Sequence, residues 1–138
     1  MDRIIRPLSE TEQSALYDGL DVASKIIDKP RPLTSDNIQE LYDFFIRTEN
    51  DFSEGIIALG LSFGQLFIEE AGYEWVRVHD EYGEETCVAP KSININCSPI
   101  SMIQKRLSAK EHIDINSLYD ETVKTIQSLI DSDQYESR

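Results

Sequence analysis

The sequence predicts an α+β fold, with about five helices packed around a central apolar helix and a small antiparallel sheet of two or three strands. Three observations support this prediction. Apolar residues recur at helical spacing toward both ends of the chain. Near the middle, one segment is apolar on nearly every side, which is typical of a helix surrounded by protein. The segment after it alternates with a period of two, as strands do. The length of 138 residues suits one core, so we expect a single domain over 1–138.

The first expected helix has clear start and stop signals. Ser9 and Glu12 have the spacing of a capping box, in which each side chain accepts a hydrogen bond from the backbone of the other residue. Apolar residues then recur at steps of four and three as far as Ile27. Pro30 and Pro32 end the helix, because proline disfavours helical geometry in the residue before it.

A second helix is expected to follow this connector. Thr34 or Ser35 can cap it, since a hydroxyl side chain at this position accepts a hydrogen bond from the first turn. Apolar residues at helical spacing then define its inward face, at Ile38, Leu41 and Phe45.

The third expected helix, from Glu54 to Ala71, is the central apolar one, and residues 50–53 precede it as a turn and cap. Gly60 and Gly64 share one face of it, and each lowers the helix propensity by up to about 1 kcal/mol relative to alanine. We therefore expect another backbone or a bulky side chain to approach this face closely. Gly72 is expected to end the helix in the left-handed conformation.

Strands are expected after the central helix. Residues 73–80 alternate, and Trp75 is expected to join the core. A polar turn containing Gly83 follows, and residues 86–89 can return as a second strand. Residues 92–97 alternate again and predict a third.

Two further helices are expected after the strands. Ser98 followed by Pro99 is typical of a helix start, because proline suits the first helical position. Asp114 or Asn116 can cap the last helix. Its expected inward-facing residues are Leu118, Thr122, Ile126 and Leu129.

The charge distribution limits the kinds of partner. The chain has 13 Lys and Arg against 26 Asp and Glu, a net charge of −13. This balance argues against nucleic acids and anionic membranes, since both are bound through basic residues. Between residues 35 and 90 there are two basic and thirteen acidic residues, so most of the excess lies in the middle of the chain.

Acidic residues cluster around the expected central helix end and the β turn. The candidate partner-binding residues are Glu69, Glu70, Glu74, Arg77, Asp80, Glu81, Tyr82, Glu84 and Glu85. Glu69 and Glu70 lie near a helix C-terminus, where the helix dipole disfavours anions, so their placement gives no local stability. Two interpretations remain open: a solvated face that promotes solubility, or a docking surface for a basic protein.

No motif in the sequence predicts catalysis. The run His79–Glu81, with Glu84 and Glu85, has oxygen and imidazole ligands, but its spacing matches no calcium loop or zinc signature. Cys87 could lie across the turn from His79 as a Cys/His pair, although no third group orients it. We therefore predict no catalytic residues, no metal site and no cofactor.

Four segments resemble a family of small bacterial domains known only as a domain of unknown function. They are GLSFG at 60–64, EWV at 74–76, DEYG at 80–83 and PISMIQKR at 99–106. The resemblance implies a bacterial origin and a helix–hairpin–helix core, but no activity and no site residues. Small acidic bacterial proteins are often immunity proteins that block basic toxins, which is an analogy of character and not of motif.

Three functional hypotheses follow. The leading one is a non-enzymatic cytoplasmic interaction protein, for example an immunity-type inhibitor, whose acidic middle binds a basic protein partner. The alternatives are a small-molecule- or metal-dependent enzyme with a site near the hairpin, and a structural adaptor or oligomer subunit. The cytoplasm is expected because residues 1–7 lack the apolar region of a secretory signal and no apolar run is long enough to span a membrane. The oligomeric state is not predicted.

Overall fold

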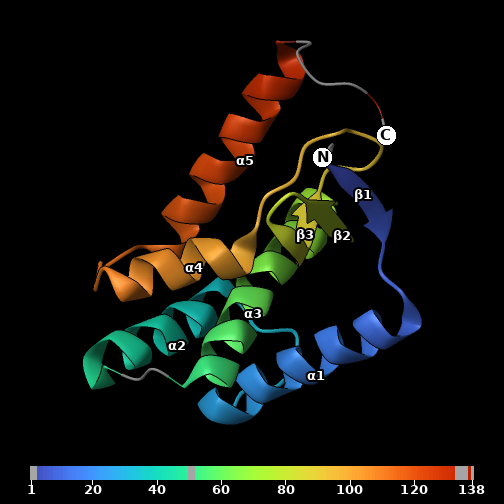
Figure 1. Cartoon of the computed structure of the whole chain (residues 1–138). Helices are drawn as coiled ribbons and strands as arrows, with labels where there is room; N and C mark the ends of the chain where they lie inside the picture. The colour runs from blue at the N-terminus through green and yellow to red at the C-terminus, as the bar shows by residue number, and fades with distance from the viewer. Residues whose placement is uncertain (1–2, 50–51, 133–136, 138) are drawn as a thin grey trace.

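The computed structural model describes residues 3–49, 52–132 and 137. In these ranges the chain forms five helices and a three-stranded antiparallel sheet, which confirms the α+β class (Figure 1). The elements in order are β1 (Ile4–Pro7), α1 (Glu10–Ile27), α2 (Ser35–Thr48), α3 (Ser53–Ala71), β2 (Glu74–Asp80), β3 (Gly83–Ala89), α4 (Pro99–Ser108) and α5 (Ile115–Asp131). Among these helices, none combines the length and apolar character needed to cross a membrane.

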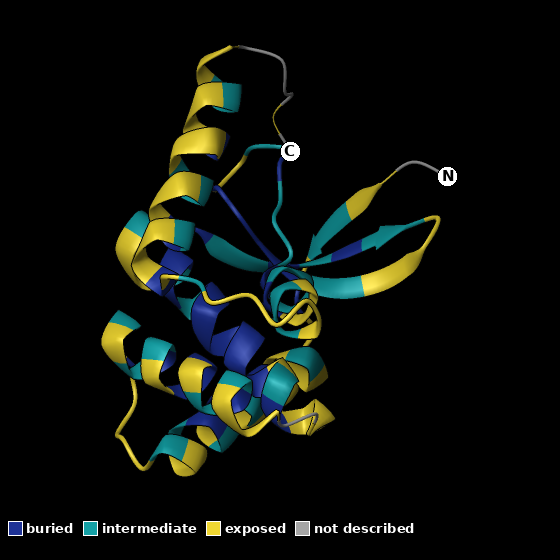
Figure 2. Ribbon diagram, turned by 90° about the vertical axis from the view of Figure 1, so that its left-hand side faces the viewer, coloured by how far each residue is buried: buried dark blue, intermediate teal, exposed yellow. Residues whose placement is uncertain are grey.

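The helix α3 is the centre of the structure, as the sequence predicts. It contacts α1, α2, α4, α5 and both strands of the hairpin, and every residue from Ala58 to Gly64 is buried (Figure 2). A Cβ atom at Gly60 would lie 2.6 Å from the Cα of Ile100 in α4. One at Gly64 would overlap the ring of Trp75. The two glycines therefore allow the close approach that their spacing predicts: a backbone approaches Gly60, and a bulky side chain approaches Gly64.

The first two helices begin as predicted. The Oγ of Ser9 accepts from the backbone of Glu12, and the Glu12 carboxylate accepts from the backbone of Ser9. Thr34, and not Ser35, caps α2, and it forms a second capping box with Asn37. The buried residues are Leu16, Leu20 and Ala23 in α1, and Ile38, Leu41, Tyr42 and Phe45 in α2. Ahead of α3, Asn50 and Asp51 of the predicted turn lie outside the described residues.

The strands β2 and β3 form a hairpin, and β3 is longer than predicted. The register pairs Glu74 with Ala89 and Asp80 with Gly83, which leaves a turn of two residues. Gly83 has a φ of 121°, a conformation that glycine adopts without strain. The chain can therefore reverse within two residues, and β3 begins at Gly83 instead of Thr86.

The prediction of a strand over 92–97 is wrong. This segment forms only isolated bridges among the described residues, at Ile93 and Cys97. Cys97 exchanges two backbone hydrogen bonds with Val88, but Ser92 has a φ of 65°, which turns the chain out of the extended conformation. The alternation of this segment therefore does not reflect a strand.

The third strand is instead β1, which the sequence analysis did not predict. Ile4–Pro7 pairs antiparallel with residues 76–79 of β2 and forms one edge of the sheet (Figure 1). Just before β1, the guanidinium of Arg3 donates to the side chains of Asn94 and Asn96 at 3.0 and 2.8 Å. Arg3 therefore joins the start of β1 to the segment that follows β3.

The last two helices show one failed and one correct cap prediction. Pro99 begins α4, but the hydroxyl of Ser98 makes no capping bond and donates to Glu85 instead. Asp114 caps α5 by accepting from the backbone of Ser117. The buried residues of α5 are Ile115, Tyr119 and Ile126, while Leu118, Thr122 and Leu129 are partly buried.

The contact between Gly60 and α4 predicts the effect of a single methyl group. In G60A, the new Cβ meets the backbone of Ile100, so α3 and α4 must separate, and overpacking of this kind costs about 1–3 kcal/mol or more. This exceeds the gain in helix propensity of up to about 1 kcal/mol. We expect a net loss of about 1–2 kcal/mol in the free energy of unfolding, measured by urea denaturation.

The matched control is G19A in α1, where the new Cβ meets only the end of the Leu61 side chain. This side chain can move, so G19A should lose less stability than G60A. A G60A protein as stable as the parent, or less affected than G19A, would contradict the proposed contact.

Candidate functional site

Eight of the nine predicted partner-binding residues fall into two groups near opposite ends of β2, and the ninth, Arg77, lies between them in β2. One group lies where α3 ends and β2 begins, and consists of Glu69, Glu70 and Glu74. A second group surrounds the turn of the hairpin, and consists of Asp80, Glu81, Tyr82, Glu84 and Glu85. Glu74 and Asp80 are at opposite ends of β2, six residues apart, which corresponds to about 20 Å in an extended strand. We call the second group the hairpin tip. Tyr82 in it is 90% exposed.

The register of the hairpin separates His79 from Cys87. Directly paired residues of a sheet place their side chains on the same face. His79 pairs with Glu84, and its Nδ1 lies 3.6 Å from the Glu84 carboxylate. Cys87 pairs with Val76, whose side chain points to the opposite face. The proposed Cys/His pair is therefore not formed.

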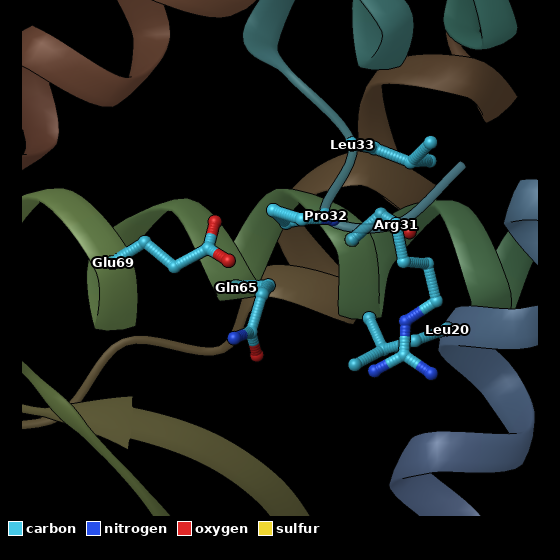
Figure 3. Close-up of a pocket in the computed structure, with 7 residues that line it drawn as sticks. Leu20, Arg31, Pro32, Leu33, Gln65 and Glu69 are labelled. Atoms are coloured by element: carbon cyan, nitrogen blue, oxygen red, sulfur yellow. The ribbon is translucent and has the colours of Figure 1, made fainter. Parts of the chain in front are cut away.

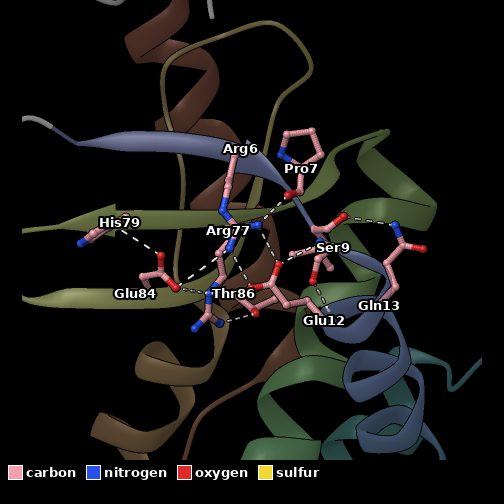
Figure 4. Close-up of polar contacts among 10 residues, drawn as sticks. Arg6, Pro7, Ser9, Glu12, Gln13, Arg77, His79, Glu84 and Thr86 are labelled. Atoms are coloured by element: carbon pink, nitrogen blue, oxygen red, sulfur yellow. Dashed lines mark hydrogen bonds and ion pairs between the residues drawn. The ribbon is translucent and has the colours of Figure 1, made fainter.

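An ion-pair network joins β1 and α1 to the hairpin (Figure 4). The guanidinium of Arg6 binds both carboxylate oxygens of Glu12, at 2.8 and 2.9 Å. The Nε of Arg77 is buried and lies 3.4 Å from Glu12 and 3.5 Å from Glu84. Arg77 also donates to the hydroxyl of Thr86 at 3.0 Å. The two arginines and two glutamates balance one another, so this network is close to neutral.

The network lowers the pKa of the Glu12 carboxyl to about 2. The main cause is the hydrogen bond from Arg6, followed by the backbone hydrogen bond from Ser9. The same hydrogen bond raises the pKa of Arg6. Both groups therefore keep their charges near neutral pH, and Glu12 is unsuited to proton transfer there. The arrangement indicates a structural and electrostatic role.

Beside this network is a groove of about 340 Å³ at the junction of α1, α3, α4 and the hairpin. Its apolar lining residues are Ala15, Leu16, Ile57, Leu61 and Ile100. Its polar lining residues are Glu12, Arg77, Glu84, Glu85 and Thr86. Ile57 is 45% exposed, so apolar surface is accessible in it. We call this the hairpin groove.

The carboxylate of Glu85 is held at one end of the hairpin groove by the start of α4. It accepts hydrogen bonds from the hydroxyls of Ser98 at 2.6 Å and Ser101 at 3.3 Å. The N-terminus of a helix stabilises a nearby negative charge, so this position suits a carboxylate. Because the two hydroxyls are uncharged, they do not offset the negative charge of the Glu85 carboxylate. Glu85 is therefore an oriented negative charge beside the apolar surface of Ile100.

The two cysteines are poorly suited to nucleophilic chemistry. Both are free, and burial raises the pKa of Cys87 to about 11 and that of Cys97 to about 12. The reactive form of cysteine is the thiolate, which is scarce at neutral pH when the pKa is high. Within the described ranges, no group of three or more His, Cys, Asp or Glu side chains is arranged to hold a metal ion.

Sequence reasoning identified Arg77, Glu84 and Glu85 but missed Arg6 and Glu12 as residues of this region. Glu12 was assigned only to the capping box, which occupies one of its carboxylate oxygens. Arg6 reaches Glu12 and the hairpin because β1 pairs with β2 across about seventy residues of sequence. No local pattern signals such a long-range pairing.

The comparisons with known proteins identify a family and a shared fold. A family model described as "Domain of unknown function (DUF3806)" matches residues 35–119, from α2 to the start of α5. None of the curated proteins matches this sequence. A crystal structure from Bacteroides thetaiotaomicron VPI-5482, at 1.50 Å resolution, superposes with a TM-score of 0.71 and 12% sequence identity. The alignment covers 89% of this chain and 48% of that one, so this chain spans about half the length of its structural neighbour.

The low pKa of Glu12 predicts how the stability depends on pH. The folded pKa of about 2 lies below the ordinary glutamate pKa of 4.5, so the ion pairs stabilise the folded state above pH 4.5. This contribution is lost as the pH falls from 4.5 toward 2. We expect E12Q to be less stable than the parent at pH 7, and the difference in urea midpoint to shrink over this acid range.

The matched control is E10Q, two residues earlier in α1, where no described residue forms an ion pair with the carboxylate. E10Q should change the urea midpoint less than E12Q, with no comparable convergence in acid. A constant difference between E12Q and the parent from pH 7 to pH 2 would contradict the role of the network.

The raised thiol pKa values predict slow chemical modification. In the folded protein at pH 7, both cysteines should react with Ellman's reagent much more slowly than in concentrated guanidinium chloride, because burial suppresses the thiolate and blocks access. The absorbance of the released thiolate measures both rates. Rapid labelling of either cysteine in the folded protein would contradict this account and would support a nucleophilic role for that cysteine.

Proposed function

The chain belongs to the DUF3806 family, a domain of unknown function, and we propose that it is a non-enzymatic interaction protein that binds a basic segment of another protein at the hairpin groove. The observation that carries this proposal is the juxtaposition of exposed apolar surface with oriented carboxylates. Ile57 and Ile100 supply the apolar floor, and Glu84 and Glu85 lie at its edge. A lysine or arginine side chain has the matching chemistry, because an apolar stem leads to a charged head.

The distribution of paired and unpaired charge supports a basic partner. Arg6 and Arg77 offset Glu12 and Glu84, so these four add little net potential. Glu85 is held by hydroxyls, and Asp80 and Glu81 at the hairpin tip have no ion-pair partner among the described residues. The net potential beside the groove is therefore negative. Such a potential speeds the encounter with a basic protein and disfavours acidic ones.

The lining of the groove supports binding and not covalent catalysis. The residues that line it include no cysteine, histidine or serine, and its charged side chains are held in ion pairs or by hydroxyls. An activated hydroxyl needs an adjacent base, but the Thr86 hydroxyl accepts a hydrogen bond from Arg77, and no hydrogen bond from it to a carboxylate is found among the described residues. The structural-adaptor hypothesis is compatible with the same surface, and differs only in the identity of the partner.

We propose that the protein acts in the cytoplasm. One kind of partner would be a basic protein whose activity it blocks. The two free thiols are compatible with a reducing compartment. An immunity-type inhibitor would use the groove to occupy a basic surface of a toxin. The hairpin tip would extend this contact, because Tyr82 is almost fully exposed and tyrosine is enriched at protein interfaces.

The direct test uses a peptide of alternating lysine and leucine, with an alternating glutamate and leucine peptide as its control. In an NMR titration we expect the basic peptide to shift the amides of Ile57, Thr86 and Ile100, and the acidic peptide to leave them unchanged. Raising the salt from roughly 0.01 M to 0.15 M shortens the Debye length from about 30 Å to about 8 Å, so the affinity should fall.

Two variants of one residue provide the matched comparison. I57K places a positive charge in the groove and should lower the affinity for the basic peptide by about tenfold. I57E places a negative charge at the same position and should not lower this affinity. E40Q on α2 removes an exposed carboxylate elsewhere and should have little effect. Equal binding by I57K and I57E, or shifts confined to α2 or α5, would refute the proposal.

A further inference from the structure

A second cavity, of about 310 Å³, lies on α3 at a different position from the hairpin groove (Figure 3). Leu20 of α1 and the connector residues Pro32 and Leu33 form an apolar wall. The polar side chains of Arg31, Gln65 and Glu69 line the same cavity. It shares no lining residue with the hairpin groove. We call it the connector pocket.

A cationic group is fixed at one end of the connector pocket. Arg31 donates through one nitrogen to Asp21 at 2.7 Å, and its guanidinium lies 5.8 Å from the centre of the Tyr17 ring. These contacts orient the guanidinium and use only part of its donor capacity. No other described residue accepts from it, so Nε and the second terminal nitrogen are available to a ligand. A planar guanidinium of this kind suits a carboxylate.

An anionic group lines the other part of the pocket. Glu69 projects from the last turns of α3, and no ion pair or hydrogen bond to its carboxylate is found among the described residues. Gln65 lies one turn earlier on the same face. The Oε1 of Gln65 accepts from the indole of Trp75 at 2.9 Å, which fixes this amide and leaves its NH₂ group to donate. In Figure 3, Glu69 and Arg31 lie at opposite sides of Pro32.

We propose that the connector pocket binds a small zwitterion, with its carboxylate at Arg31, its ammonium at Glu69 and its spacer against Leu20, Pro32 and Leu33. The volume lies at the lower end of the roughly 300–1,000 Å³ typical of ligand pockets, so it suits a small molecule. Ser62 and Glu69, which both line it, are seven residues apart on α3, a rise of about 10 Å. This length, together with the lack of an ion pair between Arg31 and Glu69 among the described residues, suits a ligand whose two charges are several bonds apart, as in an ω-amino acid or a dipeptide.

The first test compares three probes of equal chain length by calorimetry or NMR titration. 6-Aminohexanoate has both charges, hexanoate lacks the ammonium and hexylamine lacks the carboxylate. We expect 6-aminohexanoate to bind about five- to tenfold more tightly than either single-charge probe, because each charged end gains a charge-assisted hydrogen bond. Equal affinity for all three probes, or no binding of 6-aminohexanoate at millimolar concentration, would overturn the proposal.

The second test uses neighbouring glutamates as a matched pair. E69Q should abolish the preference for 6-aminohexanoate over hexanoate, whereas E70Q, which does not line the pocket, should preserve it. R31Q should instead abolish the preference over hexylamine. These changes of preference cannot arise from a general loss of stability, which would weaken all probes alike. A preference unchanged in E69Q, or lost equally in E70Q, would refute the assignment. Because I57K alters only the hairpin groove, it should leave this binding intact.

Discussion

The burial of the middle of α3, from Ala58 to Gly64, determines where the other elements lie and where binding surfaces can form. A helix that is apolar on nearly every side must be covered by protein, and α1, α2, α4, α5 and the hairpin all contact it. Gly60 and Gly64 bring the start of α4 and the ring of Trp75 against its backbone. Where the covering elements diverge, they leave the hairpin groove and the connector pocket along the same helix.

Electrostatics then distinguishes these two surfaces. Near the hairpin, Arg6 and Arg77 are held by Glu12 and Glu84, so the remaining negative charge lies on Asp80, Glu81 and Glu85. In the connector pocket, a cation and an anion line the same cavity without pairing with each other among the described residues. The first arrangement suits a basic polypeptide, and the second suits a ligand that carries both charges.

Much of the helical architecture was predictable from local patterns, because caps and glycine spacing depend on neighbouring residues. Ser9, Asp114 and the glycines of α3 behave as their positions indicate. The strand β1 was not predictable in this way, since its pairing with β2 is long-range. Only part of the candidate site was predictable, because it too depends on long-range packing. Glu84 and Glu85 line the hairpin groove as expected of partner-binding residues, whereas Glu69 lines the connector pocket.

Hydrogen exchange with and without the basic peptide tests the central claim most directly, because it reports on every backbone amide at once. If the hairpin groove is the binding surface, protection should increase in three separate segments: residues 57–61 of α3, residues 83–86 of β3 and the first turn of α4. Residues of all three segments line the hairpin groove. Protection that appears instead on the exposed acidic faces of α2 or α5, or that is absent from α3 and α4, would contradict the account.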